Sequence, residues 1–262
     1  MSRTTALIVG DASTLNRAIA LALASDGRDI VLACHAPPNG AAELRAEIER
    51  TGASVRLVQA PLDAPETPER IVGEIADLAL TVWSTGRPPA GRLIDTDAEE
   101  LDRQYALHYR SAILFTKASA NAMIETGTAG SILFVTSHHA HRAYADNVLI
   151  GSYSAALHRS AESLAMQLAP DRIRLNCIAA GETLPASPAG TEFGDQIPLG
   201  YGRDEDVADA AAFLCSERAR YMTGTVLKVD GGLTLPGMPE HGRGSGWNRP
   251  LAAPGLSTAA QK

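Results

Sequence analysis

Short apolar runs alternate with amphipathic segments along most of the chain. The apolar runs are continuous rather than alternating, which is typical of strands buried on both faces of a sheet. Seven runs predict strands, at Ala6–Val9, Asp29–Cys34, Ser54–Gln59, Leu80–Trp83, Ser131–Thr136, Arg172–Ile178 and Val226–Val229. Six stretches between them have helical spacing, at Leu15–Ser25, Ala41–Arg50, Thr67–Leu78, Ala98–Ile124, Gly151–Leu168 and Asp204–Leu214.

Strands that alternate with helices predict parallel βαβ units. We therefore expect an α/β fold with a doubly wound, Rossmann-like and mostly parallel sheet of seven strands, covered by helices on both faces. Residues 1–235 make a single domain in this interpretation. Residues 236–262 are rich in glycine, proline and small residues, which predicts a C-terminal tail rather than a second domain.

Composition narrows the function classes. The 262 residues are 45% hydrophobic, which suits a globular domain and excludes wholesale disorder. The net charge of −7, without a basic stripe, argues against nucleic-acid binding. No apolar run approaches the roughly 20 residues that cross a bilayer, and no signal peptide precedes the first strand, so we expect a cytoplasmic protein. The scattered cysteines Cys34, Cys177 and Cys215 are expected to be free buried thiols.

Several segments resemble the short-chain dehydrogenase/reductase family. The resemblance spans about residues 4–235 and is carried by Ala6–Gly10 with Arg17–Ala20, Ser163–Pro170, Ile173–Asn176, and Thr223-Gly224 with Val229–Gly232. Membership would imply the doubly wound fold, a nicotinamide dinucleotide at the carboxyl ends of the strands, and dimers or tetramers.

The segment after the first strand departs from the family's glycine motif. Family members carry three glycines that let backbone amides approach a pyrophosphate at a helix N-terminus. Here only Gly10 survives, while Thr14 and Asn16 replace the other two and Asp11 adds a negative charge. Trp83 and Pro61 also stand where the family has cofactor contacts.

The resemblance nevertheless assigns six positions to a dinucleotide, namely Gly10, Ser13, Leu15, His35, Gly86 and Gly181. His35 lies where NADP users often have a basic residue. These residues do not lead us to favour any cofactor. If dinucleotide binding is retained, NADP(H) is the dinucleotide that we expect.

The family's catalytic positions are altered as well. Its serine corresponds to Ser137, but its tyrosine and lysine fall on Ile150 and Ser154, and its asparagine falls on His108. Tyr153 lies three residues from the expected tyrosine, and none of the six tyrosines has lysine four residues later. In the family this lysine lowers the pKa of the tyrosine from about 10 toward working pH. We therefore expect no hydride transfer by the family's usual mechanism.

Histidines gather around Ser137 in the sequence. His138, His139 and His141 follow it directly, in a loop that borders the substrate pocket in the family, and His108 would face the same pocket. Histidine is suited to move protons near neutral pH. The candidate catalytic residues are therefore Ser137, His108, His139 and Tyr153.

This constellation predicts a repurposed, non-redox enzyme that performs proton transfer, elimination, cyclisation or isomerisation on a small molecule. Solvated surface histidines are the simpler interpretation of the same loop. We expect no metal site, because no carboxylate or cysteine lies nearby in the sequence.

Two other hypotheses stay open. The chain is either a non-catalytic subunit paired with a related protein in a hetero-oligomer, or an atypical NADP(H)-dependent oxidoreductase in which His108 or His139 replaces the tyrosine. The expected partners are a small-molecule substrate and further copies of the chain, as a dimer or tetramer, with no nucleic acid and no membrane.

Overall fold

A computed structural model describes residues 3–11, 13–36, 40–184 and 197–235. The predicted tail at 236–262 lies outside these residues. Seven parallel strands form one sheet in the order β3-β2-β1-β4-β5-β6-β9. Their bounds are β1 (Thr5–Gly10), β2 (Asp29–Cys34), β3 (Val55–Gln59), β4 (Leu78–Ser84), β5 (Ser131–Ser137), β6 (Arg174–Ala180) and β9 (Val226–Val229). The predicted seven-stranded, Rossmann-like α/β fold is thus confirmed.

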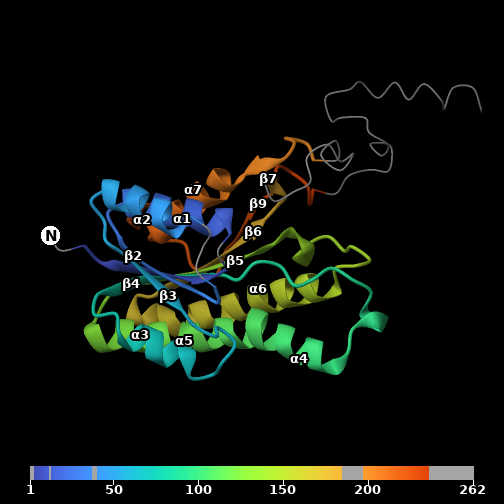
Figure 1. Cartoon of the computed structure of the whole chain (residues 1–262), viewed down its shortest axis with the longest axis horizontal. Coiled ribbons are helices and arrows are strands. Elements are labelled where there is room, and N and C mark those ends of the chain that lie inside the picture. Colours follow the sequence, from blue (N-terminus) through green and yellow to red (C-terminus); the bar gives the residue numbers. More distant parts are fainter. Residues whose placement is uncertain (1–2, 12, 37–39, 185–196, 236–262) are drawn as a thin grey trace, which may run out of the picture.

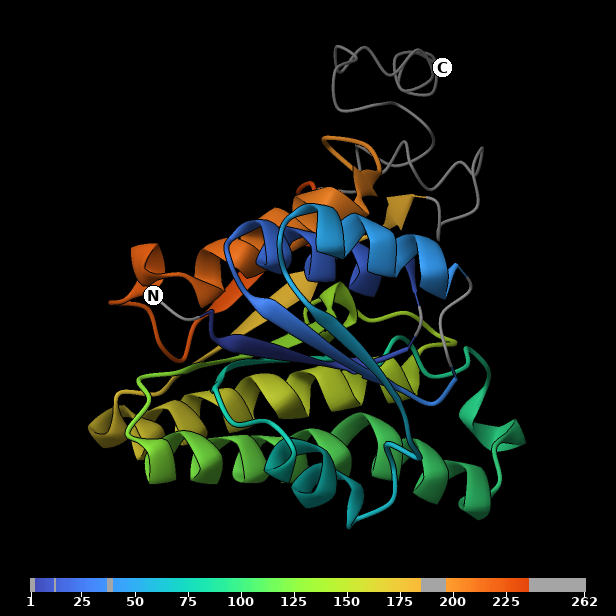
Figure 2. The same ribbon diagram turned by 60° about the vertical axis from the view of Figure 1, so that its left-hand side comes forward.

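Helices cover both faces of the sheet (Figures 1 and 2). One face carries α1 (Thr14–Ser25), α2 (Ala41–Arg50) and α7 (Asp204–Cys215). The other carries α3 (Thr67–Gly73), α4 (Ala98–Tyr105), α5 (Ser111–Thr126) and α6 (Val148–Leu168). No helix in the part of the chain that the structure describes is long and apolar enough to cross a membrane.

Each strand contributes to two hydrophobic clusters, one on either side of the sheet. On β1, Leu7 packs toward α5 and α6, and Ile8 packs toward α1 and α7. Successive side chains of a strand point to opposite faces, so a strand covered on both faces must be apolar at every position. This explains the continuous apolar runs in the sequence.

Two predicted helices differ from the structure. The helix expected at Thr67–Leu78 ends at Gly73, because the next apolar residues, from Leu78 onward, belong to β4. The helix expected at Ala98–Ile124 is interrupted by a π-helical turn at Ala106–Arg110. Such turns hold an extra residue and often occur at functional sites. Here the turn carries His108.

A second, two-stranded sheet was not predicted. It pairs β7 (Thr183–Leu184) with β8 (Gly202–Arg203), directly after β6 and directly before α7. The Thr183 hydroxyl donates to Asp204 Oδ1 at 2.7 Å and ties this small sheet to the start of α7. Two residues per strand are too few for an apolar pattern to show.

The fold places the candidate residues at the carboxyl ends of the parallel strands, which we call the carboxyl edge of the sheet. Connections run in opposite directions from the neighbouring strands β1 and β4, which makes their carboxyl ends a topological switch point. The strands end there at Gly10, Ser84, Ser137 and Ala180. In open α/β sheets, ligands bind at such an edge.

Candidate functional site

The turn between β1 and α1 is closed by a buried asparagine. Asn16 is fully buried, and its Nδ2 donates to Asp11 O, Asp11 Oδ1 and Ser84 O at 2.8–2.9 Å. Ser13 caps α1 by accepting from Asn16 N. The Asn16 side chain thus links the turn to β4 and holds the Asp11 carboxylate beside Gly86.

Two positions at this edge, Gly10 and Gly86, have no room for a side chain. A Cβ on Gly10 would overlap the Ser84 carbonyl, and Gly86 has a φ of +77° with the Asp11 carboxylate lying over it. Between them, the first N–H groups of α1, at Thr14 and Leu15, have no intrahelical acceptor. This arrangement can receive an anion, and Asp11 is the opposing charge in it.

The remaining predicted cofactor positions lie farther along the same edge. His35 follows β2, with its side chain 45% exposed and Nε2 3.9 Å from Asp63 Oδ1. Gly181 follows β6 and packs against the backbone of Asp230, where a Cβ would not fit. All six positions that the resemblance assigned to a dinucleotide therefore lie near the carboxyl ends of β1, β2, β4 and β6.

Ser137 ends β5 and forms a buried pair with His139. The Ser137 hydroxyl lies 2.7 Å from His139 Nδ1, and the side chains are almost inaccessible to solvent. Burial, followed by the neighbouring His138 and Arg87, lowers the pKa of His139 to about 4, and Glu182 opposes this shift. His139 is therefore neutral at physiological pH, and its Nδ1 can accept the serine proton.

The two residues that the resemblance aligns with the family's tyrosine and lysine lie near the start of α6. Ile150 and Ser154 are buried, and the Ser154 hydroxyl accepts from Ser137 N at 3.3 Å. A serine hydroxyl cannot carry the positive charge of the lysine that it replaces.

His108 and Tyr153 belong to a second, separate group. Their rings stack with centroids 6.4 Å apart, and His108 Nδ1 lies 3.1 Å from the Thr85 hydroxyl. Both rings line a cavity of about 30 Å³ together with Trp83, room for about one water. Burial lowers the pKa of His108 to about 4 and raises the pKa of Tyr153, so both are neutral near pH 7.

The sequence placed Ser137, His108, His139 and Tyr153 around one cavity. The structure brings together Ser137 with His139, and His108 with Tyr153, but no hydrogen bond or ring contact joins one pair to the other. Ser154 lies between them, since it lines the small cavity and binds the backbone of Ser137.

His141 lies apart from both pairs. Its ring packs on His158 with centroids 5.2 Å apart, and His158 Nε2 lies 2.7 Å from the Thr136 hydroxyl. Within the described ranges, no three histidine, cysteine or acidic side chains gather in a way that could hold a metal ion.

Sequence reasoning missed an ion pair across this edge. Arg87, after β4, binds Glu182, after β6, with an N–O distance of 3.0 Å. Glu182 Oε1 also lies 3.6 Å from Nε2 of His138, whose Nδ1 lies 3.1 Å from the Ala180 carbonyl and so donates to it. The signal for this pair is positional: each residue directly follows a glycine at a strand's carboxyl end.

Comparison with known proteins gives a consistent result. A family model described as enoyl-(acyl carrier protein) reductase matches residues 10–234. An uncharacterized oxidoreductase of Bacillus subtilis is 31% identical over 239 residues, covering 87% of this chain and 98% of the relative. Glucose 1-dehydrogenase 2 of the same organism is 28% identical, covering 88% of this chain and 95% of the relative. The crystal structure of acetoin dehydrogenase from Enterobacter cloacae superposes with a TM-score of 0.82 at 25% identity, covering 90% of this chain and 97% of that one.

These matches correct the expected reaction. The relatives are named oxidoreductases and dehydrogenases, and they match along nearly their whole length. The prediction of a repurposed non-redox enzyme is therefore wrong, and the alternative of an atypical oxidoreductase agrees better. The error came from equating the loss of one residue pair with the loss of the reaction.

Proposed function

The chain belongs to the short-chain dehydrogenase/reductase family, and from this membership we propose that it transfers a hydride between NADP(H) and a small secondary alcohol or its ketone. The observation that carries the proposal is the 2.7 Å contact between Ser137 Oγ and His139 Nδ1 at the carboxyl end of β5. This pair can supply the proton transfer that the missing Tyr-Lys pair performs elsewhere in the family. The acetoin and glucose dehydrogenases among the similar proteins support a small hydroxylated substrate.

The carboxyl edge of the sheet fits a dinucleotide, apart from one charge. Bare backbone at Gly10 and Gly86 and the N-terminus of α1 suit a pyrophosphate. His35, half exposed after β2, suits a ribose phosphate, which favours NADP(H) over NAD(H). Asp11 opposes binding, but it is exposed to solvent, which screens its charge. The nicotinamide supplies the hydride acceptor or donor when it is bound.

Ser137 and His139 would move the proton. In the oxidation direction, the substrate O–H donates its proton to Ser137 Oγ while the Ser137 proton passes to His139 Nδ1. The substrate carbon would give up its hydride to a bound nicotinamide at the same time, and a ketone would remain. His139 starts neutral because its pKa is about 4, so it is ready to accept. His108 and Tyr153 would form a wall of the substrate pocket.

A spectrophotometric assay tests the proposal. Purified protein is incubated with NADP⁺ or NAD⁺ and a panel of small secondary alcohols and hydroxyketones, and reduced cofactor is followed by its near-ultraviolet absorbance. We expect turnover with at least one alcohol and a preference for NADP⁺. A folded protein that neither binds nor reduces either dinucleotide across the panel would contradict the proposal.

The pH dependence of kcat/KM should show whether His139 acts as the base. Alcohol oxidation needs neutral His139, which predominates above about pH 4. We therefore expect kcat/KM for oxidation to stay flat from pH 8 to about pH 5 and to fall about tenfold per pH unit below pH 4. Ketone reduction needs the protonated form and should accelerate as the pH falls toward 4. A plateau for oxidation reached only above pH 7 would rule out a base with this pKa.

Removing the charge of Asp11 should strengthen cofactor binding. Asp11→Asn keeps an oxygen that can accept from Asn16 Nδ2 but no longer repels the pyrophosphate. We expect the Kd for NADPH to fall about tenfold at low salt and less at high salt, where the charge is screened. Titration by fluorescence measures the change, and Asp26→Asn, at the far end of α1, is the matched control. An unchanged Kd would show that Asp11 does not face the phosphates.

Self-association belongs to the same proposal. Exposed apolar side chains on the outer helices, Ile124 on α5 and Met166 on α6, support contacts between copies of the chain. Light scattering that gives the mass of a dimer or tetramer would agree, and a monomer at all concentrations would not.

A further inference from the structure

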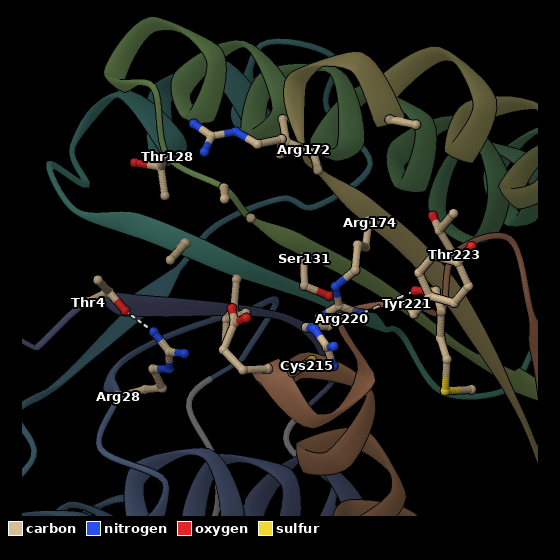
Figure 3. Close-up of a pocket in the computed structure, with 18 residues that line it drawn as sticks. Thr4, Arg28, Thr128, Ser131, Arg172, Arg174, Cys215, Arg220, Tyr221 and Thr223 are labelled. Carbon is tan, nitrogen blue, oxygen red and sulfur yellow. Dashed lines mark hydrogen bonds between the residues drawn. The ribbon is translucent and has the colours of Figure 1, made fainter.

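A cavity lies at the opposite edge of the sheet from Ser137, where the strands begin. It has a volume of about 650 Å³ and opens at the amino ends of β4, β5 and β6, beside Leu80, Ser131 and Arg174 (Figure 3). Ser131 and Ser137 are the two ends of β5, so about 20 Å of strand separates the cavity from the catalytic edge. A ligand in it would not touch the proposed active site.

Arginines dominate the polar walls of this cavity. Arg28, Arg172, Arg174 and Arg220 line it, with Glu217 as the only acid among the lining residues. Arg28, Arg172 and Arg220 come from three separate loops, and Arg174 begins β6. In Figure 3 Arg172 lies on the wall opposite Arg28 and Arg220. The cavity is thus strongly positive in a chain whose net charge is −7.

Arg174 has a structural role that the others lack. Its guanidinium donates to the carbonyl oxygens of Leu214, Ser216 and Met222 and so closes the C-terminal end of α7. By contrast, among the residues that the structure describes, Arg28 donates only to the neutral hydroxyl of Thr4. Within the described segments, neither Arg28, Arg172 nor Arg220 forms an ion pair. Three guanidinium groups are therefore available to a ligand.

The backbone conformation of Arg172 independently supports a ligand site at this cavity. Its φ is +58°, and it is the only non-glycine residue with a positive φ in the described part of the chain. A side chain is disfavoured in this conformation, and glycine would make the same turn between Ala169–Asp171 and β6 without strain. Residues held in strained conformations cluster at ligand sites.

Apolar side chains form another part of the cavity wall. Leu80, Ala129, Ile173 and Met222 contribute to its walls, and the ring of Tyr221 at its rim is completely exposed. Aromatic rings exposed beside guanidinium groups suit a ligand that has both an apolar body and an anionic end.

We propose that this cavity binds a phosphate monoester with an apolar or aromatic organic group. Three free arginines against Glu217 leave two positive charges, which match the dianionic phosphate near pH 7. Guanidinium groups bind phosphate oxygens in pairs, and the apolar wall receives the organic group. The site is distinct from the dinucleotide cleft and does not depend on the proposed redox activity.

Phenyl phosphate is a suitable probe. We expect saturable one-to-one binding to the full chain by calorimetry, weaker binding at high salt, and much weaker binding of phenol or of inorganic phosphate alone. Arg220→Ala and Arg172→Gly should each weaken binding about tenfold or more, because each removes charge-assisted hydrogen bonds. Arg218→Ala is the matched control, since Arg218 packs over the Phe213 ring, outside this cavity, and should leave the affinity unchanged.

Arg172→Gly separates binding from folding. Glycine relieves the left-handed strain, so the variant should melt at the same or a higher temperature than the parent protein while it loses affinity. Turnover in the absence of the ester should stay unchanged. The proposal is overturned if phenyl phosphate does not saturate, if both arginine variants bind it normally, if inorganic phosphate binds as tightly, or if NADP⁺ competes for the same site.

Discussion

Replacing Ser137 with alanine is expected to lower kcat for alcohol oxidation by about 10²–10⁴-fold, the usual contribution of positioned acid–base groups. Alanine removes the hydroxyl that lies 2.7 Å from His139 Nδ1, so the substrate proton has no relay to the histidine. His139→Gln should cause a loss of similar size, because glutamine cannot accept the proton. Steady-state kinetics with the best substrate from the alcohol panel would measure both effects.

The two changes should not add. If Ser137 and His139 act as one unit, the double variant is about as slow as either single variant. Ser137→Thr restores a hydroxyl and should recover part of the rate. His141→Gln is the matched control, because His141 packs on His158 and has no contact with Ser137. Full activity in Ser137→Ala, with unchanged melting, would remove the pair from the mechanism.

Trp83→Ala is expected to destabilise the fold by about 3–5 kcal/mol, as large-to-small changes of buried aromatic residues do. Trp83 is 2% exposed at the end of β4, and its ring lies 5.8 Å from that of Phe115 on α5. Alanine would leave a cavity between the sheet and this helix. Chemical denaturation would give the free energy of unfolding, and the melting temperature should fall by roughly 10 °C.

Two further variants test whether the lost stability comes from the packing of the Trp83 ring. Trp83→Phe keeps an aromatic ring and should lose much less stability. Tyr221→Ala, which removes a fully exposed ring, should change the unfolding free energy by no more than about 0.5 kcal/mol. A loss below about 1 kcal/mol for Trp83→Ala would show that the side chain is not part of a packed core.

The packing of Trp83 bears on the sequence interpretation of this residue. The resemblance placed it where family members contact the cofactor, which weighed against dinucleotide binding. In the structure the Trp83 side chain is buried in the hydrophobic core and also lines the small cavity beside His108 and Tyr153. Its ring therefore restricts the small cavity beside His108 and Tyr153, which we propose to form a wall of the substrate pocket.

The identity of the elements could be predicted from the sequence because it follows from local patterns. On β1, the residues Ala6–Val9 are buried on one face or the other, so this apolar run predicts a central parallel strand directly. Helix boundaries were less certain where two elements share one apolar segment, as at Gly73 and Leu78.

Some features of the candidate site also follow from the sequence, whereas others depend on the tertiary structure. The sequence by itself determined the fold, the carboxyl-edge location of Ser137 and the absence of a lysine beside any candidate tyrosine, because register and spacing along one chain fix these features. Only the tertiary structure decided that His139 rather than His108 contacts Ser137, that Arg87 meets Glu182 across the edge, and that arginines from three loops surround one cavity. These contacts join residues on different strands and loops, and strand order, loop path and side-chain rotamer, which no local pattern encodes, set the distances between them.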